Sequence, residues 1–232
     1  MDIGYAVSFA FKDPDWLKKL AVGALYTLAC IFIIPIPILI GYHLATMRNS
    51  LNGAKHPLPS WENAGELFSD GLKFFLVVLI YSLPIMLLYG LTIGAVIIAA
   101  QNENSPGVFL NLAQCVGFIF SLTLAMIMPA VTLQYVQHNN IGACFNFSEI
   151  FAYTRRNLGN VLLAWLSIIV ATLMLQIATA VAAITVCGAI FVGLAGIPWM
   201  GAVRGNLYAQ VALNDEQWGK SDKEAFFDDF SY

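Results

Sequence analysis

The chain has 232 residues, of which 59% are apolar and only 11% are charged. An ordinary soluble domain is about 45–50% apolar and about 25% charged. Eleven basic and 14 acidic residues cannot cover the surface of a soluble protein of this length, and a net charge of -3 gives no basic field for nucleic acid. The composition therefore excludes a soluble enzyme, a nucleic-acid binder and a disordered chain. It predicts an all-α, polytopic membrane protein in contact with the lipid bilayer.

Four helical spans are predicted from long uncharged stretches, since one span takes about 20 apolar residues. Residues 74–100 and 108–136 provide one span each. Residues 161–203 are too long for one helix, and they divide near residues 185–188, where threonine and glycine interrupt the apolar run.

The uncharged residues 20–44 need a different interpretation because Pro35 and Pro37 stand at their centre. Two prolines so close remove two amide donors and break a helix. Basic residues collect on cytoplasmic loops, and all 11 of them share one side only if this stretch turns back at the prolines. We therefore predict six membrane segments in three helical hairpins, with both termini on the cytoplasmic side of a cell (inner) membrane. The apolar tip, IFIIPIPILI, leaves open a re-entrant first hairpin.

The chain then divides into one membrane domain, residues 1–213, and a tail, residues 214–232, that is rich in acidic and aromatic residues. The domain contains three similar units, each with a short amphipathic segment expected at the interface, an outgoing helix and a returning helix. The units cover about residues 1–56, 57–138 and 139–213, and their amphipathic segments are residues 3–11, 61–72 and 147–155. Duplication of one unit and the shared pattern of any helical hairpin explain this repeat equally well.

The sequence offers no recognisable catalytic, cofactor-binding or metal site, so we predict that the protein is not an enzyme. All 14 carboxylates fall in termini or connections, whereas ionisable groups inside the bilayer are the usual sign of transport or catalysis. The lack of a carboxylate in mid-span also disfavours a proton-coupled carrier. The four cysteines stand far apart and form no CxxC pair, which favours buried thiols over a disulfide or a metal site.

A few polar residues remain as candidates for a polar path or for lipid contact. These candidates are Gln114, Gln176, His43, His138 and Arg204. Interhelical hydrogen bonds are the simpler explanation of the glutamines, and a position at the interface is the simpler explanation of the histidines. A solute path through the two glutamines is the functional alternative.

Two pairs of glycines at four-residue spacing are expected to let helices approach closely. They are Gly90 with Gly94, and Gly201 with Gly205. Small residues at this spacing allow the backbones of membrane helices to touch. We expect these pairs to pack within the chain, and a dimer is the alternative.

Several short segments in the first third of the chain are distinctive in combination. They are FKDPDWLKK at residues 11–19, IGY at 40–42, LPSW at 58–61, ELF at 66–68 and DGLK at 70–73. Together they resemble a prokaryotic membrane-protein family, the domain-of-unknown-function family numbered four thousand and thirteen. The distinctive matches lie between residue 1 and about residue 85, and the later helices resemble the family in pattern only. The resemblance implies a prokaryotic multi-pass protein, and it carries over no activity and no site residues.

These observations lead first to a non-catalytic scaffold or an accessory subunit of a membrane complex, partnered by other membrane subunits or by copies of itself. The alternative is a transporter or channel for an uncharged or lipidic substrate, which broken helices in repeated hairpins favour. A lipid-modifying enzyme that uses His43, His138 and Arg204 at the cytoplasmic face is a third hypothesis.

Overall fold

The computed structural model describes residues 1–54, 58–101 and 107–215, and these are almost entirely helical, with no strand among them. The all-α prediction is therefore confirmed for the described residues. In chain order the elements are α1 (Ile3–Ser8), η1 (Phe9–Lys12), α2 (Trp16–Ala29), η2 (Cys30–Phe32), α3 (Ile36–Leu51), α4 (Ala64–Gln101), α5 (Gly107–His138), η3 (Ile141–Phe145), α6 (Phe147–Arg156), α7 (Leu158–Ala182) and α8 (Val186–Leu213).

Four helices are long and apolar enough to cross a membrane, and they are the four predicted from the uncharged stretches: α4, α5, α7 and α8. The predicted break between the last two is present, because α7 ends at Ala182 and α8 begins at Val186. Thr185 caps α8 by accepting a hydrogen bond from the backbone N–H of Gly188 at 3.2 Å. A threonine cap satisfies one of the amides that a helix start leaves unpaired.

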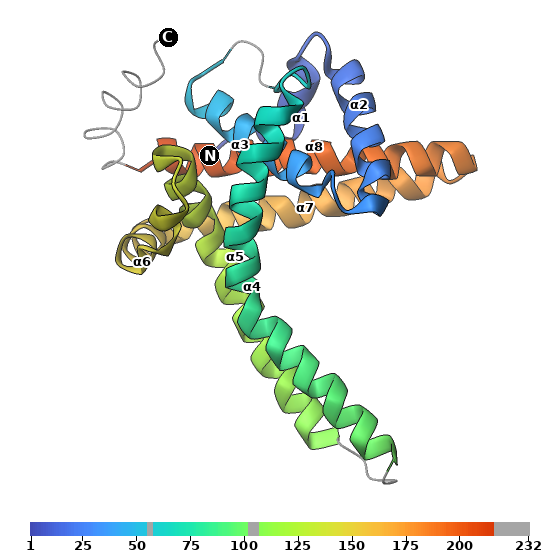
Figure 1. The fold of residues 1–232 in the computed structure, drawn as a ribbon. Helices are drawn as coiled ribbons and strands as arrows, with labels where there is room; N and C mark the ends of the chain where they lie inside the picture. The colour runs from blue at the N-terminus through green and yellow to red at the C-terminus, as the bar shows by residue number, and fades with distance from the viewer. Residues whose placement is uncertain (55–57, 102–106, 216–232) are drawn as a thin grey trace.

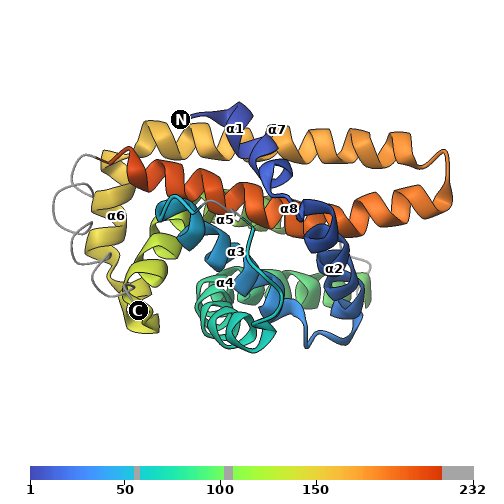
Figure 2. The ribbon, with the colours of Figure 1, turned by 90° about the horizontal axis from the view of Figure 1, so that it is seen from above.

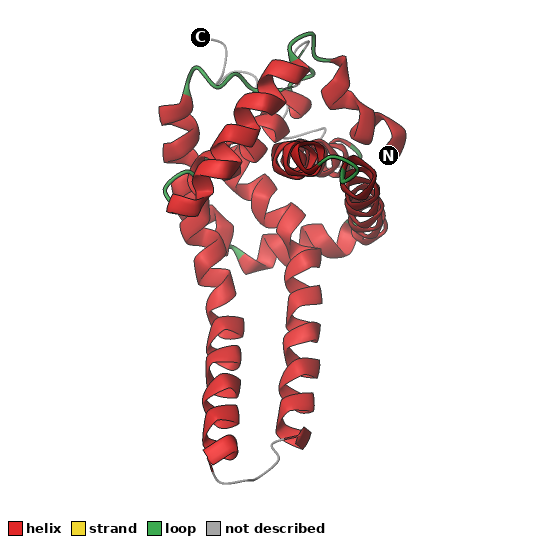
Figure 3. Ribbon diagram, turned by 90° about the vertical axis from the view of Figure 1, so that its right-hand side faces the viewer, coloured by secondary structure: helices red, strands yellow, loops and turns green. Residues whose placement is uncertain are grey.

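The long helices form two pairs whose outer halves point in different directions. The α4–α5 pair projects away from the other helices, whereas α7 and α8 run side by side and cross its base (Figures 1 and 3). Viewed from above, α8 lies between α7 on one side and α2 and α3 on the other (Figure 2). Large apolar side chains on the outer half of each pair are exposed, as Leu91 and Ile177 illustrate.

The stretch around the two prolines turns back on itself in a tight reversal. Ile33 takes a positive φ of 65° there, and α3 starts from Pro35. The two helices on either side have 14 and 16 residues; at about 1.5 Å per residue they are shorter than the hydrocarbon core of about 30 Å. The side chains at the tip, Ile31 to Ile34, are 69–77% exposed.

The amphipathic segments behave differently in the three units. The first and third are separate short helices, α1 with η1 and α6, as predicted. The second is not separate, because residues 64–72 form the first turns of α4, a single helix of 38 residues. No proline interrupts the chain between that segment and the span, and extending an existing helix is easier than starting a new one. The prediction of a separate short helix before every hairpin is therefore wrong for the second unit.

Two helices cross with direct backbone contact at the centre of the fold. Gly41 of α3 and Gly71 of α4 face each other so closely that a Cβ atom on either would lie under 3.0 Å from the opposite backbone, at Leu67 or Pro37 respectively. A third glycine, Gly23 of α2, lies against the ring of Pro198 in α8, where a Cβ would come within 2.7 Å. These crossings bring α2, α3, α4 and α8 together around fully buried side chains of α3 and α8, among them Tyr42, Met47 and Leu207.

Candidate functional site

The most elaborate polar arrangement joins the N-terminal segment to the connection that precedes α4. Asp13 is 1% exposed, and its carboxylate accepts from the Lys19 ammonium at 2.8 Å and from the backbone N–H of Leu58 at 3.3 Å. Lys19 also donates to the carbonyl of Leu58 at 2.7 Å. A buried carboxylate requires such partners, since an unpaired charge away from water is very costly.

An aromatic stack lies next to this ion pair. The indole of Trp61 is sandwiched between Tyr42, 4.3 Å away between ring centroids, and Tyr26, 5.0 Å away. The indole N–H donates to the backbone carbonyl of Lys19 at 2.8 Å. The three sequence segments at residues 11–19, 40–42 and 58–61, which lie far apart in the chain, therefore meet in one place.

Two further ion pairs connect other elements. Arg48 of α3 pairs with Asp70 of α4. Arg156 at the end of α6 donates two hydrogen bonds to the Asp215 carboxylate, from Nε to Oδ1 at 3.1 Å and from Nη2 to Oδ2 at 2.6 Å. The side chain of Asn157 donates to the same carboxylate at 2.8 Å. Planar two-point contact of this kind is specific to arginine. These three carboxylates, Asp13, Asp70 and Asp215, are thus used to tie distant segments together.

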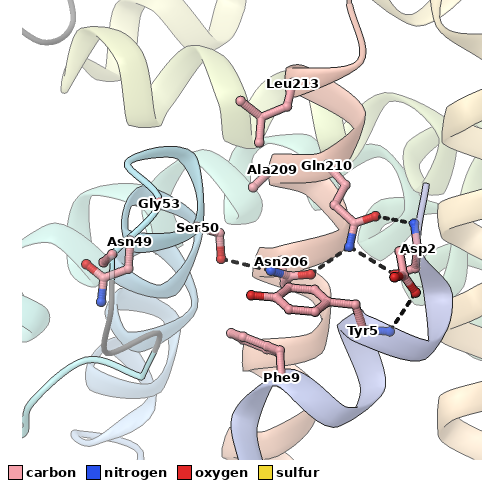
Figure 4. A pocket seen from close by; sticks show the side chains of 11 residues that line it. Asp2, Tyr5, Phe9, Asn49, Ser50, Gly53, Asn206, Ala209, Gln210 and Leu213 are labelled. Atoms are coloured by element: carbon pink, nitrogen blue, oxygen red, sulfur yellow. Dashed lines mark hydrogen bonds between the residues drawn. The ribbon is translucent and has the colours of Figure 1, made fainter. Parts of the chain in front are cut away.

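A pocket of about 210 Å³ lies between α1, α3 and α8 (Figure 4). Its polar wall is a chain of hydrogen bonds in which Asn206 donates to Ser50 at 3.1 Å and accepts from Gln210 at 2.8 Å. The side chain of Gln210 also binds the backbone of Asp2. It accepts from the Asp2 N–H at 2.7 Å and donates to the Asp2 carbonyl at 3.1 Å. The Gln210 amide therefore holds the N-terminal segment against α8, and the Asn206 amide joins α8 to α3.

A groove of about 310 Å³ opens on the outer half of the α4–α5 pair. It is lined by Tyr89, Gln114, Cys115, Phe118 and Ser121. Gln114 and Cys115 are exposed there. The phenol of Tyr89 lies over Gly117, where a Cβ atom would meet its oxygen at 3.0 Å.

Comparison with known proteins shows that one protein family matches this chain. A model described as "Protein of unknown function (DUF4013)" matches residues 24–203, which is more than half of the chain. The chain belongs to the DUF4013 family. The match includes α4, α5, α7 and most of α8, so the family likeness extends beyond residue 85. The distinctive segments from residue 40 to residue 73 lie inside the match, and the segment at residues 11–19 lies before it. No curated protein and no solved structure matches the chain.

Of the candidates for a polar path in this DUF4013 chain, His43 makes the clearest tertiary contact. Its Nδ1 atom is 2.9 Å from the carbonyl oxygen of Gly201 in α8, and its ring meets Tyr208 edge-on at 5.7 Å. Arg204 is exposed on α8, and His138 is exposed at the end of α5. Within the described part of the chain, no group of three His, Cys, Asp or Glu side chains is placed to hold a metal ion.

The two glutamines are not brought together. Gln114 lies on the outer half of α5 and Gln176 on the outer half of α7, and these halves diverge (Figures 1 and 3). Both side chains are exposed. A polar path that passes both glutamines within a single copy of the DUF4013 chain does not follow from this arrangement.

The two glycine pairs also differ. Gly205 packs on α3, because its Cβ position lies 2.9 Å from the His43 carbonyl oxygen, and Gly201 is in ordinary contact with the His43 side chain. At Gly90 and Gly94 an added Cβ would meet nothing within 4 Å. No described residue therefore packs against the Cβ position of Gly90 or Gly94, in contrast to the expected packing within the chain.

Sequence reasoning missed the aromatic stack on Trp61 and the crossing of Gly41 with Gly71. Gly41 and Trp61 belong to the distinctive segments, so their unusual combination was a usable signal. The sequence does not show that Trp61 and Tyr42 stack, because that contact depends on how α3 and the segment before α4 pack.

Burial makes Cys144 in η3 a poor nucleophile, and this can be measured. Desolvation raises the pKa of its thiol from 9.0 to about 11. In a variant that retains only Cys144, we expect slow alkylation by N-ethylmaleimide at pH 7.5 and still at pH 9, whereas exposed Cys187 in the matching variant reacts readily. Because the folded pKa lies above the unfolded value, the contribution of this thiol to stability is present below pH 9 and lost as the pH rises through about 11. Equal alkylation rates for the two cysteines would contradict the buried position.

Proposed function

We propose that this DUF4013 chain is a multi-pass membrane protein that serves as a scaffold or an accessory subunit of a membrane complex. The observation that carries the proposal is the contrast between the two regions of the fold. Polar groups at the base of the fold are engaged in internal ties such as Asp13 with Lys19 and Asp215 with Arg156. The long helices meanwhile expose apolar side chains over their outer halves. Such surfaces suit lipid and neighbouring membrane helices.

The proposed placement puts the basic residues and both termini on the cytoplasmic side. The α4–α5 and α7–α8 pairs cross the bilayer, and the turn between α2 and α3 enters it without crossing. Two observations support the shallow position of that turn: its helices are short, and the isoleucines at its tip are exposed. The exposed lysines at residues 12 and 18 lie before α2 or within its first turn, where they suit anionic headgroups.

Impermeant thiol labelling in intact cells checks this placement. In a variant that retains only Cys187, at the turn between α7 and α8, we expect labelling from outside. A cysteine that replaces Lys12 in a variant without other cysteines should react only after the cells are permeabilised. Ile33→Cys, at the tip of the shallow turn, should stay protected in both conditions. Labelling of Lys12→Cys from outside would contradict the proposed orientation.

The experiment that tests the scaffold proposal is native mass spectrometry of the tagged protein, extracted in mild detergent with lipids retained. A foreign membrane subunit in stoichiometric amount supports the proposal. A preparation that carries no foreign subunit and instead one specific solute contradicts it and favours the transporter.

A carrier of an uncharged or lipidic substrate is the second candidate function, and the groove at Tyr89 and Gln114 favours it. A substrate that binds there would raise the melting temperature in proportion to its concentration. The Gln114→Leu variant would lose that stabilisation.

A further inference from the structure

The exposed amides on the outer half of α5 have no partner in the described part of the chain. Gln114 and Asn111 stand one turn apart, both exposed, and neither has a hydrogen bond to a described residue. The hydroxyls on the same helix are satisfied internally, since Ser121 donates to the Gly117 carbonyl at 2.8 Å and Thr123 to that of Ile119 at 3.0 Å. On the outer half of α5, the carboxamides of Asn111 and Gln114 are therefore the polar groups without a partner among the described residues.

Gln114 lies among exposed apolar side chains, near the start of the apolar part of α5. The α5 helix from Leu110 to His138 is apolar enough to span, and its exposed neighbours include Leu112, Phe118 and Ile119. An amide that faces hydrocarbon without a partner costs several kcal/mol. Lipid acyl chains have no hydrogen-bond donor or acceptor, so contact with them does not remove the free-energy cost of the unpaired amide.

The groove offers a surface against which a second polypeptide can pack. Gln114 forms part of its wall with Tyr89 of α4, a residue that is 43% exposed, and with Phe118. Aromatic side chains such as these are enriched at the centre of protein contacts.

We propose that two copies of this chain associate along the α4–α5 groove, with the Gln114 carboxamides hydrogen-bonded across a two-fold axis. A carboxamide has both a donor and an acceptor, so it is complementary to its own copy. A two-fold interface places equivalent residues opposite each other near the axis. This inference rests on the proposed membrane placement of α4 and α5, and it names a second copy as one partner of the scaffold.

Cys115 allows a direct test because it lines the same groove. In native membranes, a variant that retains only Cys115 should form a covalent dimer with a short bis-maleimide. A variant that retains only Cys187, at the turn between α7 and α8, should not. Cross-linking at Cys187 instead of Cys115 would place any dimer on another face and overturn the proposal.

The role of Gln114 is tested by Gln114→Leu, with Gln176→Leu as the matched control. Both glutamines are exposed in apolar helices, and only Gln114 lies in the groove. We expect Gln114→Leu to weaken the dimer by about 3-fold to 30-fold, the range for one or two interhelical hydrogen bonds, and Gln176→Leu to leave it unchanged. An unchanged dimer in Gln114→Leu overturns the proposed contact.

Alkaline extraction of the same membranes separates the two levels of the proposal. A protein that resists extraction but remains monomeric overturns the dimer and leaves the membrane placement standing. A protein that is released from the membrane overturns both. Retention of one lipid species by a monomer in native mass spectrometry identifies lipid as the occupant of the groove, and this also overturns the dimer.

Discussion

Replacing Gly71 or Gly41 with alanine is expected to cause the largest loss of stability of any single methyl group added to this protein. Each new Cβ would lie under 3.0 Å from backbone atoms of the opposite helix, at Pro37 or Leu67. Backbone atoms of a packed helix cannot rotate aside, so α3 and α4 must separate. We expect the free energy of unfolding to fall by about 3 kcal/mol or more. Titration with a denaturing detergent, followed by tryptophan fluorescence, measures this change.

Gly90→Ala is the matched control for this substitution. Gly90 lies in the same helix as Gly71, and an added Cβ there meets nothing within 4 Å. Alanine also has a higher helix propensity than glycine, by about 1 kcal/mol. Gly90→Ala should therefore leave the stability of the monomer unchanged or raise it. A Gly71→Ala protein as stable as Gly90→Ala would show that α3 and α4 do not cross where the structure has them.

The single long helices could be predicted from the sequence because a bilayer imposes a simple rule on each of them. Inside the bilayer, where water is absent, the backbone N–H and C=O groups must bond to each other, and a helix achieves this. About 20 apolar residues in one helix cross the hydrocarbon core. The spans α4, α5, α7 and α8 follow from that rule, and the turn before α8 follows from Thr185 and Gly188. The reversal at Pro35 follows from the loss of amide donors.

Contacts between helices could not be predicted in the same way, because they depend on two surfaces at once. The spacing of Gly90 and Gly94 equals that of Gly201 and Gly205, yet only the second pair meets another helix in the described structure. The crossing at Gly41 and Gly71 has no comparable spacing signal, because its two glycines belong to different helices. The continuous helix α4 was missed for a local reason, namely that amphipathic and apolar stretches join without a break at Gly71.

The distinctive motifs of the N-terminal third acquire a physical meaning from the fold. Asp13 and Tyr42, which are buried, and Lys19 and Trp61, which are partly buried, form one cluster that fixes the start of α2 to the chain before α4. This cluster joins α2 and α3 to the segment that precedes α4. The ring of Trp61 there lies 3.1 Å from the position that a Cβ atom on Gly23 of α2 would take. The motif residues therefore determine how the short N-terminal helices are held against the long ones.

Lys19→Met is expected to destabilise the protein by about 3 kcal/mol, because it leaves the Asp13 carboxylate buried without its cation. The substitution also leaves the Leu58 carbonyl without its donor. Lys18→Met is the matched control, since Lys18 is the exposed neighbour, and its effect should stay within about 0.5 kcal/mol. Adding Asp13→Asn to Lys19→Met should restore part of the loss, because removing both charges is less costly than isolating one. Thermal unfolding of the wild type, Lys19→Met, Asp13→Asn, their double variant and the Lys18→Met control in one detergent measures this coupling. Additive effects of Lys19→Met and Asp13→Asn would mean that the ion pair does not hold α2 in place.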